Sequence, residues 1–354
     1  MWWGIANFVG EMKIKSDKIF MRRALQLARG GAGHVSPNPM VGAVVVHDGT
    51  IVGEGYHRRW GEAHAEVNAI ASVKDRSLLP SSTVYVTLEP CAHYGKTPPC
   101  AQLLIDSRVA RVVVGTLDPF AKVAGRGVAM LREAGIEVTV GVLEEECRDL
   151  NRRFLTAHSE GRPWVMLKWA QSADGFIAPR EGNCRLSSAL TTTLMHRERA
   201  RVDAIVVGAR TVTIDDPSLT VRHWCGHQPL RVVLSRAGSI PATSRVLTDG
   251  FDTLVYNRMK NSHDGPVEWA VLDTSRPETW LRDLYSRGIT SVMVEGGAEI
   301  LIQMIAAGTW DEARVETAPV LLREGVTAPA ITGRTLSRET VDGRHITRLV
   351  PLGD

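Results

Sequence analysis

The sequence predicts an α/β protein built from two layered domains. Its 354 residues exceed the usual size of one domain. Short apolar runs typical of strands alternate with amphipathic stretches typical of helices, a pattern that indicates sheets covered by helices. The pattern is interrupted at "RRFLTAHSEGRPW", residues 152–164, where polar residues precede Gly161 and Pro163. We therefore expect an irregular N-terminal extension over 1–15 and domains over 16–158 and 159–354.

The first half is expected to hold a mixed series of strands and helices. An amphipathic helix at 20–29 precedes a loop rich in glycine and proline, and the turn "HDGT" joins the first two strands. Gly135 ends the last helix of this half. In chain order the expected strands cover 41–46, 51–56, 84–88, 111–115 and 138–142, and the later helices cover 62–73, 100–107 and 127–134.

The second half begins a new α/β series. Its expected strands cover 164–170, 204–208, 230–234, 253–256 and 291–295, and its helices cover 190–201 and 299–307. The strand "SVMVE" runs into Gly296 and Gly297 before a helix, so backbone N–H groups at that helix start can favour a phosphate. No G-x-G-x-x-G follows an early strand of this half. The residues alone therefore indicate a nucleotide-binding α/β domain. The alternative is that the two glycines only form a tight turn.

Composition narrows the class of protein. A hydrophobic content of 44% with 23% charged residues is typical of a soluble globular chain, and a net charge of +3 is too small to indicate nucleic acid as a partner. Five scattered cysteines, an odd number, do not form a disulfide framework. The start of the chain has neither a basic leader nor an apolar run long enough for a bilayer. We expect a cytoplasmic protein.

Four residues form a first chemical pattern. "AHAE" places His64 and Glu66 at a helix start, and "EPCAHYGKTPPC" adds Cys91 and Cys100. One histidine and two cysteines suit tetrahedral Zn²⁺ with an open fourth position, as in a catalytic site. H-x-E followed by P-C and a further cysteine is typical of zinc nucleobase deaminases. A redox cysteine pair and a structural zinc site, with His93 as fourth ligand, are the alternatives.

Glu66 has a predicted role in this chemistry. Zinc lowers the pKa of a bound water to about 7. Glu66 would take the water proton and pass it to the ring nitrogen and then to the departing amine, which moves one proton twice without a second acid or base. We expect Glu66 to be the catalytic proton shuttle of a deaminase.

The motifs also resemble a known family. "HAEVNAI" and "TLEPCAHYGKTPPC", with eight residues between the cysteines, resemble the RibD family of bifunctional riboflavin-biosynthesis enzymes. "SPNPMVGAVVV", "LKWAQSADGFIA", "VDAIVVGARTV", "DDPSLTVR" and "VEGGAEIL" extend the resemblance over nearly the whole chain after residue 12. It implies a cytidine-deaminase-like three-layer α/β/α domain followed by a dihydrofolate-reductase-like α/β domain.

The resemblance also implies two reactions and two cofactors. The first is zinc-dependent hydrolytic deamination of 2,5-diamino-6-ribosylamino-4(3H)-pyrimidinone 5′-phosphate. The second is NADPH-dependent reduction of the ribosyl side chain to ribityl, giving 5-amino-6-ribitylamino-uracil 5′-phosphate. The expected partner is this small pyrimidine ribotide, with no nucleic acid and no membrane. A homo-oligomer, either a dimer or a tetramer, is possible in such a family.

Further residues are candidates for substrate contact in the first domain. The amide of Asn38 in the stiff "PNP" segment can pair with the donor and acceptor edges of a pyrimidine. Between the cysteines, His93 and Lys96 can meet a phosphate and Thr97 offers a hydroxyl. His57 is also kept as a candidate because it closely precedes the site helix.

The reductase residues follow from the resemblance, motif by motif. Lys168 and Asp215 are candidates for polarising or protonating the opening sugar. Two arginines among the substrate contacts suit a phosphate through bidentate hydrogen bonds. Positions matching the family's substrate contacts are Asn183, Arg199, Leu219, Arg222 and Glu295. Positions matching its NADPH contacts are Ala170, Arg185, Thr211, Asp215, Ser235, Gly297, Ala298, Glu299, Ile300, Leu301, Ile302 and Gln303.

One stretch departs from the family pattern. In "GNCRLSS", Arg185 stands where many members have an aromatic residue, and Asn183 stands where they have a small hydroxyl. Arg185 could stack on the nicotinamide or meet the 2′-phosphate of NADPH. The alternative function is therefore a zinc deaminase of another nucleotide, or of RNA bases, with an inactive reductase-like domain.

Overall fold

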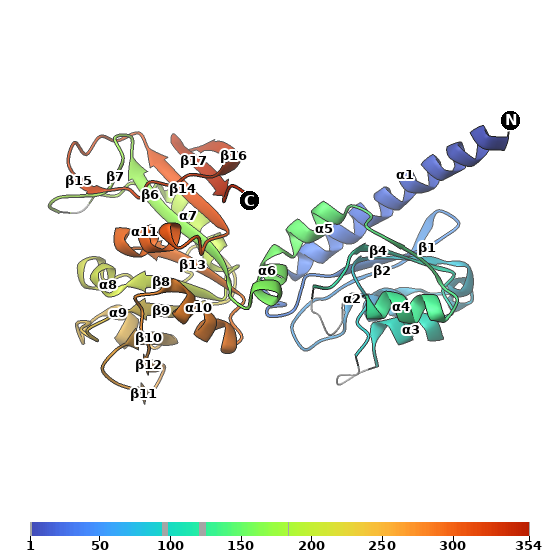
Figure 1. Cartoon of the computed structure of the whole chain (residues 1–354), viewed down its shortest axis with the longest axis horizontal. Coiled ribbons are helices and arrows are strands. Elements are labelled where there is room, and N and C mark those ends of the chain that lie inside the picture. Colours follow the sequence, from blue (N-terminus) through green and yellow to red (C-terminus); the bar gives the residue numbers. More distant parts are fainter. Residues whose placement is uncertain (1, 94–97, 120–124, 183, 354) are drawn as a thin grey trace. The chain divides into compact units, whose positions relative to one another are not determined.

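The computed structural model divides the chain into two compact units (Figure 1). It describes residues 2–93, 98–119, 125–182 and 184–353, with only the backbone for 2–14. The division falls between Glu160 and Gly161, two residues after the expected boundary. Within the segment expected to separate the domains, Arg152–Glu160 forms helix α6.

The first unit contains one five-stranded sheet in the order β2-β1-β3-β4-β5. β1 runs antiparallel to β2 and β3, whereas β3, β4 and β5 are mutually parallel. Parallel neighbours require crossover connections, which helices α3 and α4 provide. The strands are β1 Gly42–His47, β2 Thr50–Tyr56, β3 Thr83–Leu88, β4 Arg111–Thr116 and β5 Glu137–Val140.

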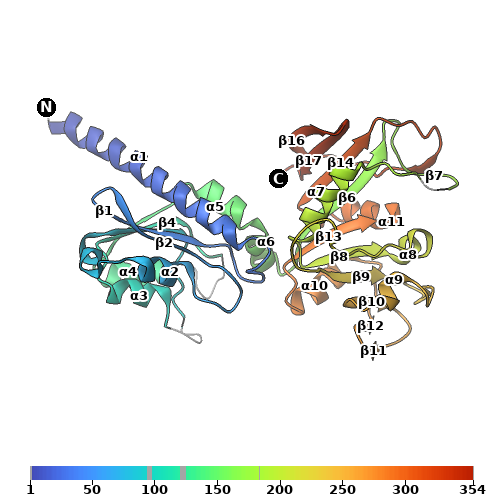
Figure 2. The same cartoon turned by 180° about the vertical axis from the view of Figure 1, so that it is seen from behind.

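Helices cover both faces of this sheet (Figures 1 and 2). Successive strand residues point to opposite faces, so Val84 and Val86 pack against one helix layer and Tyr85 against the other. α2, α3 and α4 form the first layer, and α1 and α5 form the second. The expected three-layer α/β/α arrangement is confirmed. The helices are α1 Trp2–Ala28, α2 Ala65–Ser72, α3 Cys100–Asp106, α4 Arg126–Glu133 and α5 Glu144–Leu150, with short 3₁₀ turns at Arg29–Gly31 and Arg76–Ser81.

The N-terminal segment corrects one expectation. Residues 2–15 were expected to be irregular, but their backbone belongs to helix α1, Trp2–Ala28. Its C-terminal part is anchored, since Met21, Ala24 and Leu25 are buried against the sheet. Extending an existing helix costs much less than nucleating one, so the anchored turns support helix toward the N-terminus.

The second unit is organised around a ten-stranded sheet in the order β11-β12-β10-β9-β8-β13-β6-β14-β17-β16. The run from β12 to β14 is parallel, and antiparallel strands flank it on both sides. The strands are β6 Trp164–Ser172, β8 Ala204–Gly208, β9 Leu230–Leu234, β10 Thr253–Asn257, β11 Ser262–Asp264, β12 Val267–Val271, β13 Ser291–Gly296, β14 Glu312–Ala318, β16 Arg334–Val341 and β17 Arg344–Val350. β7 Phe176–Pro179 and β15 Gly325–Thr327 form a separate ribbon.

This sheet also has a core on each face. Leu167 and Val294 face the side covered by α10 and α11, while Met166 and Met293 face α7, α8 and α9. The helices are α7 Ala189–Arg199, α8 Ala209–Asp215, α9 Arg245–Thr248, α10 Pro277–Ser286 and α11 Ala298–Ala306. Among the described residues, no helix combines the length and apolar character needed to cross a bilayer.

Candidate functional site

Three elements of the first unit bring the predicted metal ligands together. His64 immediately precedes α2, Cys91 follows the end of β3, and Cys100 is the first residue of α3. α2 lies directly on β2, because a Cβ atom at Gly55 would stand 2.3 Å from the backbone nitrogen of Ala69. A side chain at position 55 would displace the helix that follows His64.

The three donor atoms form one cluster. The ring nitrogen of His64 and the two sulfurs lie within 4.8 Å of one another. His64 Nδ1 is 3.3 Å from Cys100 Sγ and 3.7 Å from Cys91 Sγ, and the Cys100 N–H donates to Cys91 Sγ at 3.2 Å. A histidine nitrogen and two thiolates are ligands that Zn²⁺ prefers. Among the described residues the cluster has three members, and His93 is not one of them.

Electrostatics distinguish the two thiols and the nearby carboxyl. The hydrogen bond with Cys100 lowers the pKa of Cys91 to about 4, and the pKa of Cys100 is raised by its bond to Cys91 and by burial. Glu66 is buried, and this burial, with the adjacent Cys91 charge, raises its pKa to about 7. A carboxyl with such a pKa can both accept and release a proton near neutral pH.

Two predicted substrate residues lie beside the metal donors. The rings of His57 and His64 are 5.5 Å apart. His57 Nδ1 lies 3.1 Å from the carbonyl oxygen of Ala63, and its Nε2 lies 3.2 Å from the amide nitrogen of Asn38. Because a carbonyl only accepts, His57 carries its proton on Nδ1 and its Nε2 accepts from Asn38. His93 is exposed, and Lys96 and Thr97 lie outside the described residues.

Sequence reasoning missed two residues that hold this site in place. Asn151 binds both backbone groups of Met40, at 2.8 and 2.9 Å, which fixes the segment that carries Asn38. The buried Glu89 carboxylate accepts the N–H groups of Gly125 at 2.9 Å and Val128 at 3.2 Å. Only the position of Glu89 beside the "PC" motif could have drawn attention to it.

The second unit contains a cavity of about 790 Å³ near the ends of β6, β8 and β13. Most of the predicted reductase residues line it, although they come from distant parts of the chain. The predicted residues in its wall are Lys168, Ala170, Arg185, Thr211, Asp215, Ser235, Glu295, Gly297, Ala298, Glu299, Ile300, Leu301 and Gln303. Sequence reasoning did not anticipate other wall residues, among them Ile177, Leu186, Gly208, Arg236, Thr274 and Val326.

Buried charges surround one end of this cavity. Arg199 binds Glu295 through two hydrogen bonds of 2.6 and 2.7 Å. Lys168 and Glu295 share the sheet face of Met166 and Met293, since side chains alternate along β6 and β13. Burial lowers the pKa of Lys168, while the Glu295 carboxylate acts in the opposite direction.

The start of α11 provides a backbone surface suited to a phosphate. Gly297 has φ +79°, a value that favours glycine, and α11 begins directly after it. The first N–H groups of a helix have no intrahelical acceptor and attract anions. The size of the cavity, this helix start and the Lys168 side chain fit a dinucleotide with a reducible substrate.

A few predicted contacts lie elsewhere. Ile302 is exposed and is not among the residues that line the cavity. Leu219 and Arg222 belong to the segment after α8, and Arg199 reaches that segment through the carbonyl oxygen of Thr220 at 3.2 Å. Asn183 lies outside the described residues.

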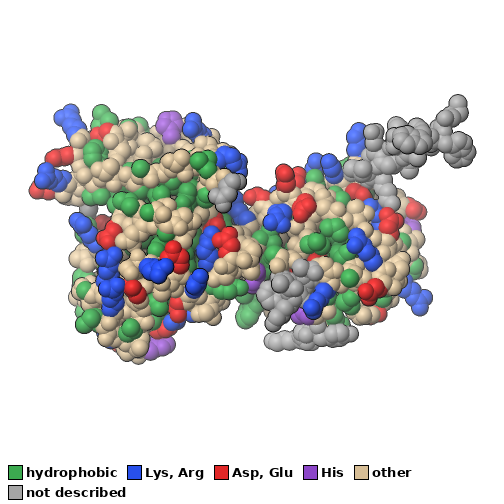
Figure 3. All heavy atoms as spheres, in the orientation of Figure 1, with side chains coloured by type: hydrophobic (Ala, Val, Ile, Leu, Met, Phe, Trp, Pro, Cys, Tyr) green, Lys and Arg blue, Asp and Glu red, His purple; other side chains and the backbone are tan. Residues whose placement is uncertain are grey.

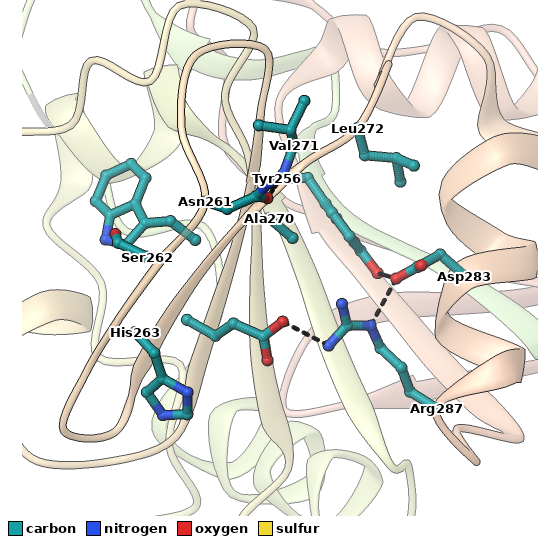
Figure 4. A pocket seen from close by; sticks show the side chains of 11 residues that line it. Tyr256, Asn261, Ser262, His263, Ala270, Val271, Leu272, Asp283 and Arg287 are labelled. Atoms are coloured by element: carbon teal, nitrogen blue, oxygen red, sulfur yellow. Dashed lines mark hydrogen bonds and ion pairs between the residues drawn. The ribbon is translucent and has the colours of Figure 1, made fainter.

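A shallower cavity of about 530 Å³ lies beside β10, β12 and α10 (Figure 4). Its charged and phenolic groups pair with one another. Tyr256 donates to Asp283 at 2.5 Å, and Arg287 binds Asp283 at 2.6 Å and Glu268 at 2.8 Å. Because these groups satisfy one another and no predicted site residue lines this cavity, the larger cavity is the better candidate.

The described surface carries both signs of charge. On the face drawn in Figure 3, basic and acidic side chains are interspersed over both units. This distribution does not resemble the basic stripe of a nucleic-acid-binding face.

Known protein families match both units. Residues 14–116 match the family described as the cytidine and deoxycytidylate deaminase zinc-binding region, and residues 163–349 match the RibD C-terminal domain. The riboflavin biosynthesis protein RibD of Aquifex aeolicus is 41% identical over 318 residues, which cover 88% of this chain and 89% of that protein. RibD of Escherichia coli is 37% identical over 330 residues, covering 86% and 88%.

Solved structures give the same result. A Thermotoga maritima diaminohydroxyphosphoribosylaminopyrimidine deaminase/5-amino-6-(5-phosphoribosylamino)uracil reductase is 36% identical with a TM-score of 0.88, covering 96% of this chain and all of that one. RibD of Acinetobacter baumannii is 33% identical with the same TM-score and the same coverage. These matches confirm the expected fold class of each unit.

Proposed function

Since this chain belongs to the RibD family and is a bifunctional deaminase and reductase of riboflavin biosynthesis, we propose the substrate and the residues that act in each reaction. The first unit deaminates 2,5-diamino-6-ribosylamino-4(3H)-pyrimidinone 5′-phosphate. The second unit uses NADPH to reduce the ribosyl side chain to ribityl, which gives 5-amino-6-ribitylamino-uracil 5′-phosphate. The substrate assignment is supported by the similarity of this chain to the Thermotoga maritima diaminohydroxyphosphoribosylaminopyrimidine deaminase/5-amino-6-(5-phosphoribosylamino)uracil reductase.

The donor cluster of His64, Cys91 and Cys100 carries the proposal for the deaminase. Three protein ligands leave the fourth position of a tetrahedral ion for a small molecule, and no fourth protein donor joins them among the described residues. A purely structural zinc site would need that fourth donor. When bound, zinc makes water nucleophilic at neutral pH.

Glu66 moves the protons in this proposal. Its carboxylate takes a proton from the attacking water and donates it to the pyrimidine ring nitrogen. It then takes the remaining proton of the added hydroxyl and donates it to the amino group, so that the C–N bond breaks, ammonia leaves and the carbonyl forms. A pKa of about 7, raised by burial, makes both protonation states accessible at the working pH. Asn38, held by His57, offers an amide to the pyrimidine edge.

The large cavity of the second unit supports the proposal for the reductase. The first turn of α11 and Gly297 would hold a phosphate of NADPH, with Thr211 and Ser235 in the same wall. NADPH supplies the hydride when bound. Lys168 would polarise the opened sugar at C1′, next to Glu295, and Asp215 would serve as a further proton donor at the cavity wall.

The experiment supplies the diaminopyrimidine ribotide with and without NADPH and follows both products by mass. We expect loss of the amine without NADPH and the ribityl product only with NADPH. Glu66→Gln should keep zinc and lower ammonia release about 1000-fold or more, since a general acid–base residue contributes roughly 100- to 10,000-fold.

The exposed Glu62→Gln, in the segment that leads into the same helix α2, is the matched control and should retain full activity. Normal turnover by Glu66→Gln would disprove the proton-shuttle role. Absence of NADPH oxidation with the deaminated intermediate supplied would disprove the assignments in the second unit.

A further inference from the structure

The segment 216–223 of the second unit has a backbone conformation that needs external support. It follows α8, lies outside regular secondary structure and carries Leu219 and Arg222. Asp216 has φ +38° and Leu219 has φ +54°, values that cost energy for residues with a side chain. Such conformations persist where surrounding contacts hold them, frequently at binding sites.

Side chains from outside the segment supply this support. Gln228 binds both backbone groups of Val221, at 2.7 and 2.9 Å. Arg199 donates to the carbonyl oxygen of Thr220 at 3.2 Å, and Arg231 donates to that of Ser218 at 3.2 Å. The backbone of the segment is therefore held by side chains instead of by a strand partner.

His196 on α7 makes the last of these contacts. The backbone N–H of Arg222 donates to His196 Nδ1 at 2.9 Å. A backbone N–H is only a donor, so Nδ1 must be unprotonated and the neutral ring carries its proton on Nε2. His196 is 2% exposed. Burial, followed by the charges of Arg199, Arg222 and His223, lowers the pKa of His196 to about 4, against an opposite effect of Glu295.

The Arg222 side chain is accessible to a ligand and keeps hydrogen-bond donors beyond the one that binds Thr220. The residue is exposed, and its Nη1 donates to the hydroxyl of Thr220 at 2.9 Å. The hydrogen bond from its backbone to His196 fixes the point from which the guanidinium projects. Arg199, which holds the same segment, also binds Glu295 in the cavity wall.

We propose that His196 is a positioning residue for substrate binding in the reductase, because its neutral ring holds the Arg222 backbone so that the guanidinium meets the phosphate of the ribotide. This inference rests on the proposed reduction of a ribotide by the second unit, and on the expectation from the family resemblance that Arg222 contacts the substrate phosphate. It assigns a role in this reaction to His196 and specifies the tautomer that the role requires, with the ring proton on Nε2. Without the His196 acceptor, the Arg222 end of the segment 216–223 loses a contact that fixes it. We therefore expect weaker binding of the substrate phosphate and an unchanged rate of hydride transfer.

The test compares two variants of His196. His196→Asn places an amide oxygen near the position of Nδ1 and keeps the acceptor, whereas His196→Leu removes it. The reductase is assayed with the deaminated ribotide and with its phosphate-free form. We expect His196→Leu to raise KM for the ribotide about 10-fold, the effect typical of one lost buried hydrogen bond. We expect kcat and the KM for the phosphate-free form to change less than about twofold, within ordinary variation for remote sites.

Two reference variants show whether the effect on KM depends on the contact between His196 and Arg222. Arg222→Gln should remove the same preference for the phosphorylated substrate, and the exposed His263→Asn should behave as wild type. His196→Asn should restore KM to within about threefold of wild type. Deaminase activity, measured on the same preparations, should be unchanged and serves as a control for the quality of each preparation.

Hydrogen exchange of the Arg222 amide in the full-length protein gives a readout independent of activity. It should rise in His196→Leu and return toward the wild-type rate in His196→Asn. Equal KM changes for both substrate forms, or equal effects of Leu and Asn, would overturn the positioning role. If Arg222→Gln itself leaves the phosphate preference intact, the expected contact between Arg222 and the substrate phosphate is wrong and the inference fails with it, whereas the proposed deaminase and reductase activities are unaffected.

Discussion

The deaminase site and the reductase cavity are assembled in different ways. The metal donors His64, Cys91 and Cys100 come from the starts of α2 and α3, two helices of one layer, and from the loop after β3, and backbone packing such as that at Gly55 sets their positions. The reductase cavity collects side chains from strands and helices spread over most of its unit, and ion pairs such as Arg199–Glu295 hold them. A change in the first site should therefore act locally, whereas a change in the second should affect binding and folding together.

The sharpest test of this contrast is removal of one metal ligand. Cys100→Ser should reduce zinc content from about one per chain to about one tenth, and ammonia release should fall at least about 1000-fold, because both the ligand set and the activated water are lost. NADPH oxidation with the deaminated intermediate should stay within about twofold, as expected for sites that share no residues. Metal analysis and the two activity assays measure this.

Cys225→Ser is the control, since Cys225 is exposed and belongs to the other unit. If the reductase activity of Cys100→Ser fell in parallel with the deaminase activity, the metal site would not be local, and the contrast between the two units would be wrong.

A charge substitution in the reductase should have a mixed effect. Glu295→Gln leaves the Arg199 guanidinium, whose side chain is 13% exposed, without its carboxylate partner. Although burial raises the pKa of Glu295, Arg199 holds it below its usual value, so the ionised pair stabilises the fold at neutral pH and loses this effect as the pH falls. Breaking a buried pair costs about 3 kcal/mol of unfolding free energy.

Reductase activity of Glu295→Gln should also fall about 100-fold, because Lys168 loses the electrostatic attraction of the Glu295 carboxylate and the segment held by Arg199 is released. Denaturant unfolding and NADPH oxidation measure the two effects. Glu268→Gln is the matched control, since its partner Arg287 keeps Asp283. Loss of activity without loss of stability would show that the ion pair acts only on the reaction.

The same contrast explains what the sequence could predict. The metal ligands follow from a short motif whose residue types and order have a direct chemical meaning. The reductase contacts came from resemblance, because no local spacing indicates that Lys168 in β6 and Glu295 in β13 lie on one face of adjacent strands. His196 was missed because a single histidine on a helix gives no sign of the backbone group that it accepts.

Strand β14 shows why a sequence pattern can mislead about burial. Its alternation of Glu312, Arg314 and Glu316 with apolar residues is typical of a strand with one solvent-facing side, yet all three charged residues are buried. Thr191 of α7 donates to Glu316 at 2.7 Å, and Arg348 of β17 binds Glu312. The partners come from elements far along the chain, so the sequence of the strand alone cannot reveal them.

The smallest expected effect tests the departure of this chain from its family at Arg185. The residue is exposed, lines the reductase cavity and makes a long hydrogen bond of 3.4 Å to Thr192, so its guanidinium can turn toward a cofactor. If it meets the 2′-phosphate of NADPH, Arg185→Ala should lower kcat/KM for NADPH about 10-fold and leave NADH unchanged, because a guanidinium recognises phosphate through paired hydrogen bonds. Steady-state assays with both cofactors measure this.

The control is Arg180→Ala, a substitution of an exposed residue paired with Glu324, which should change neither value. Equal losses for NADPH and NADH would instead indicate stacking on the nicotinamide, and no loss for either would leave the cavity wall at this position without a part in cofactor binding.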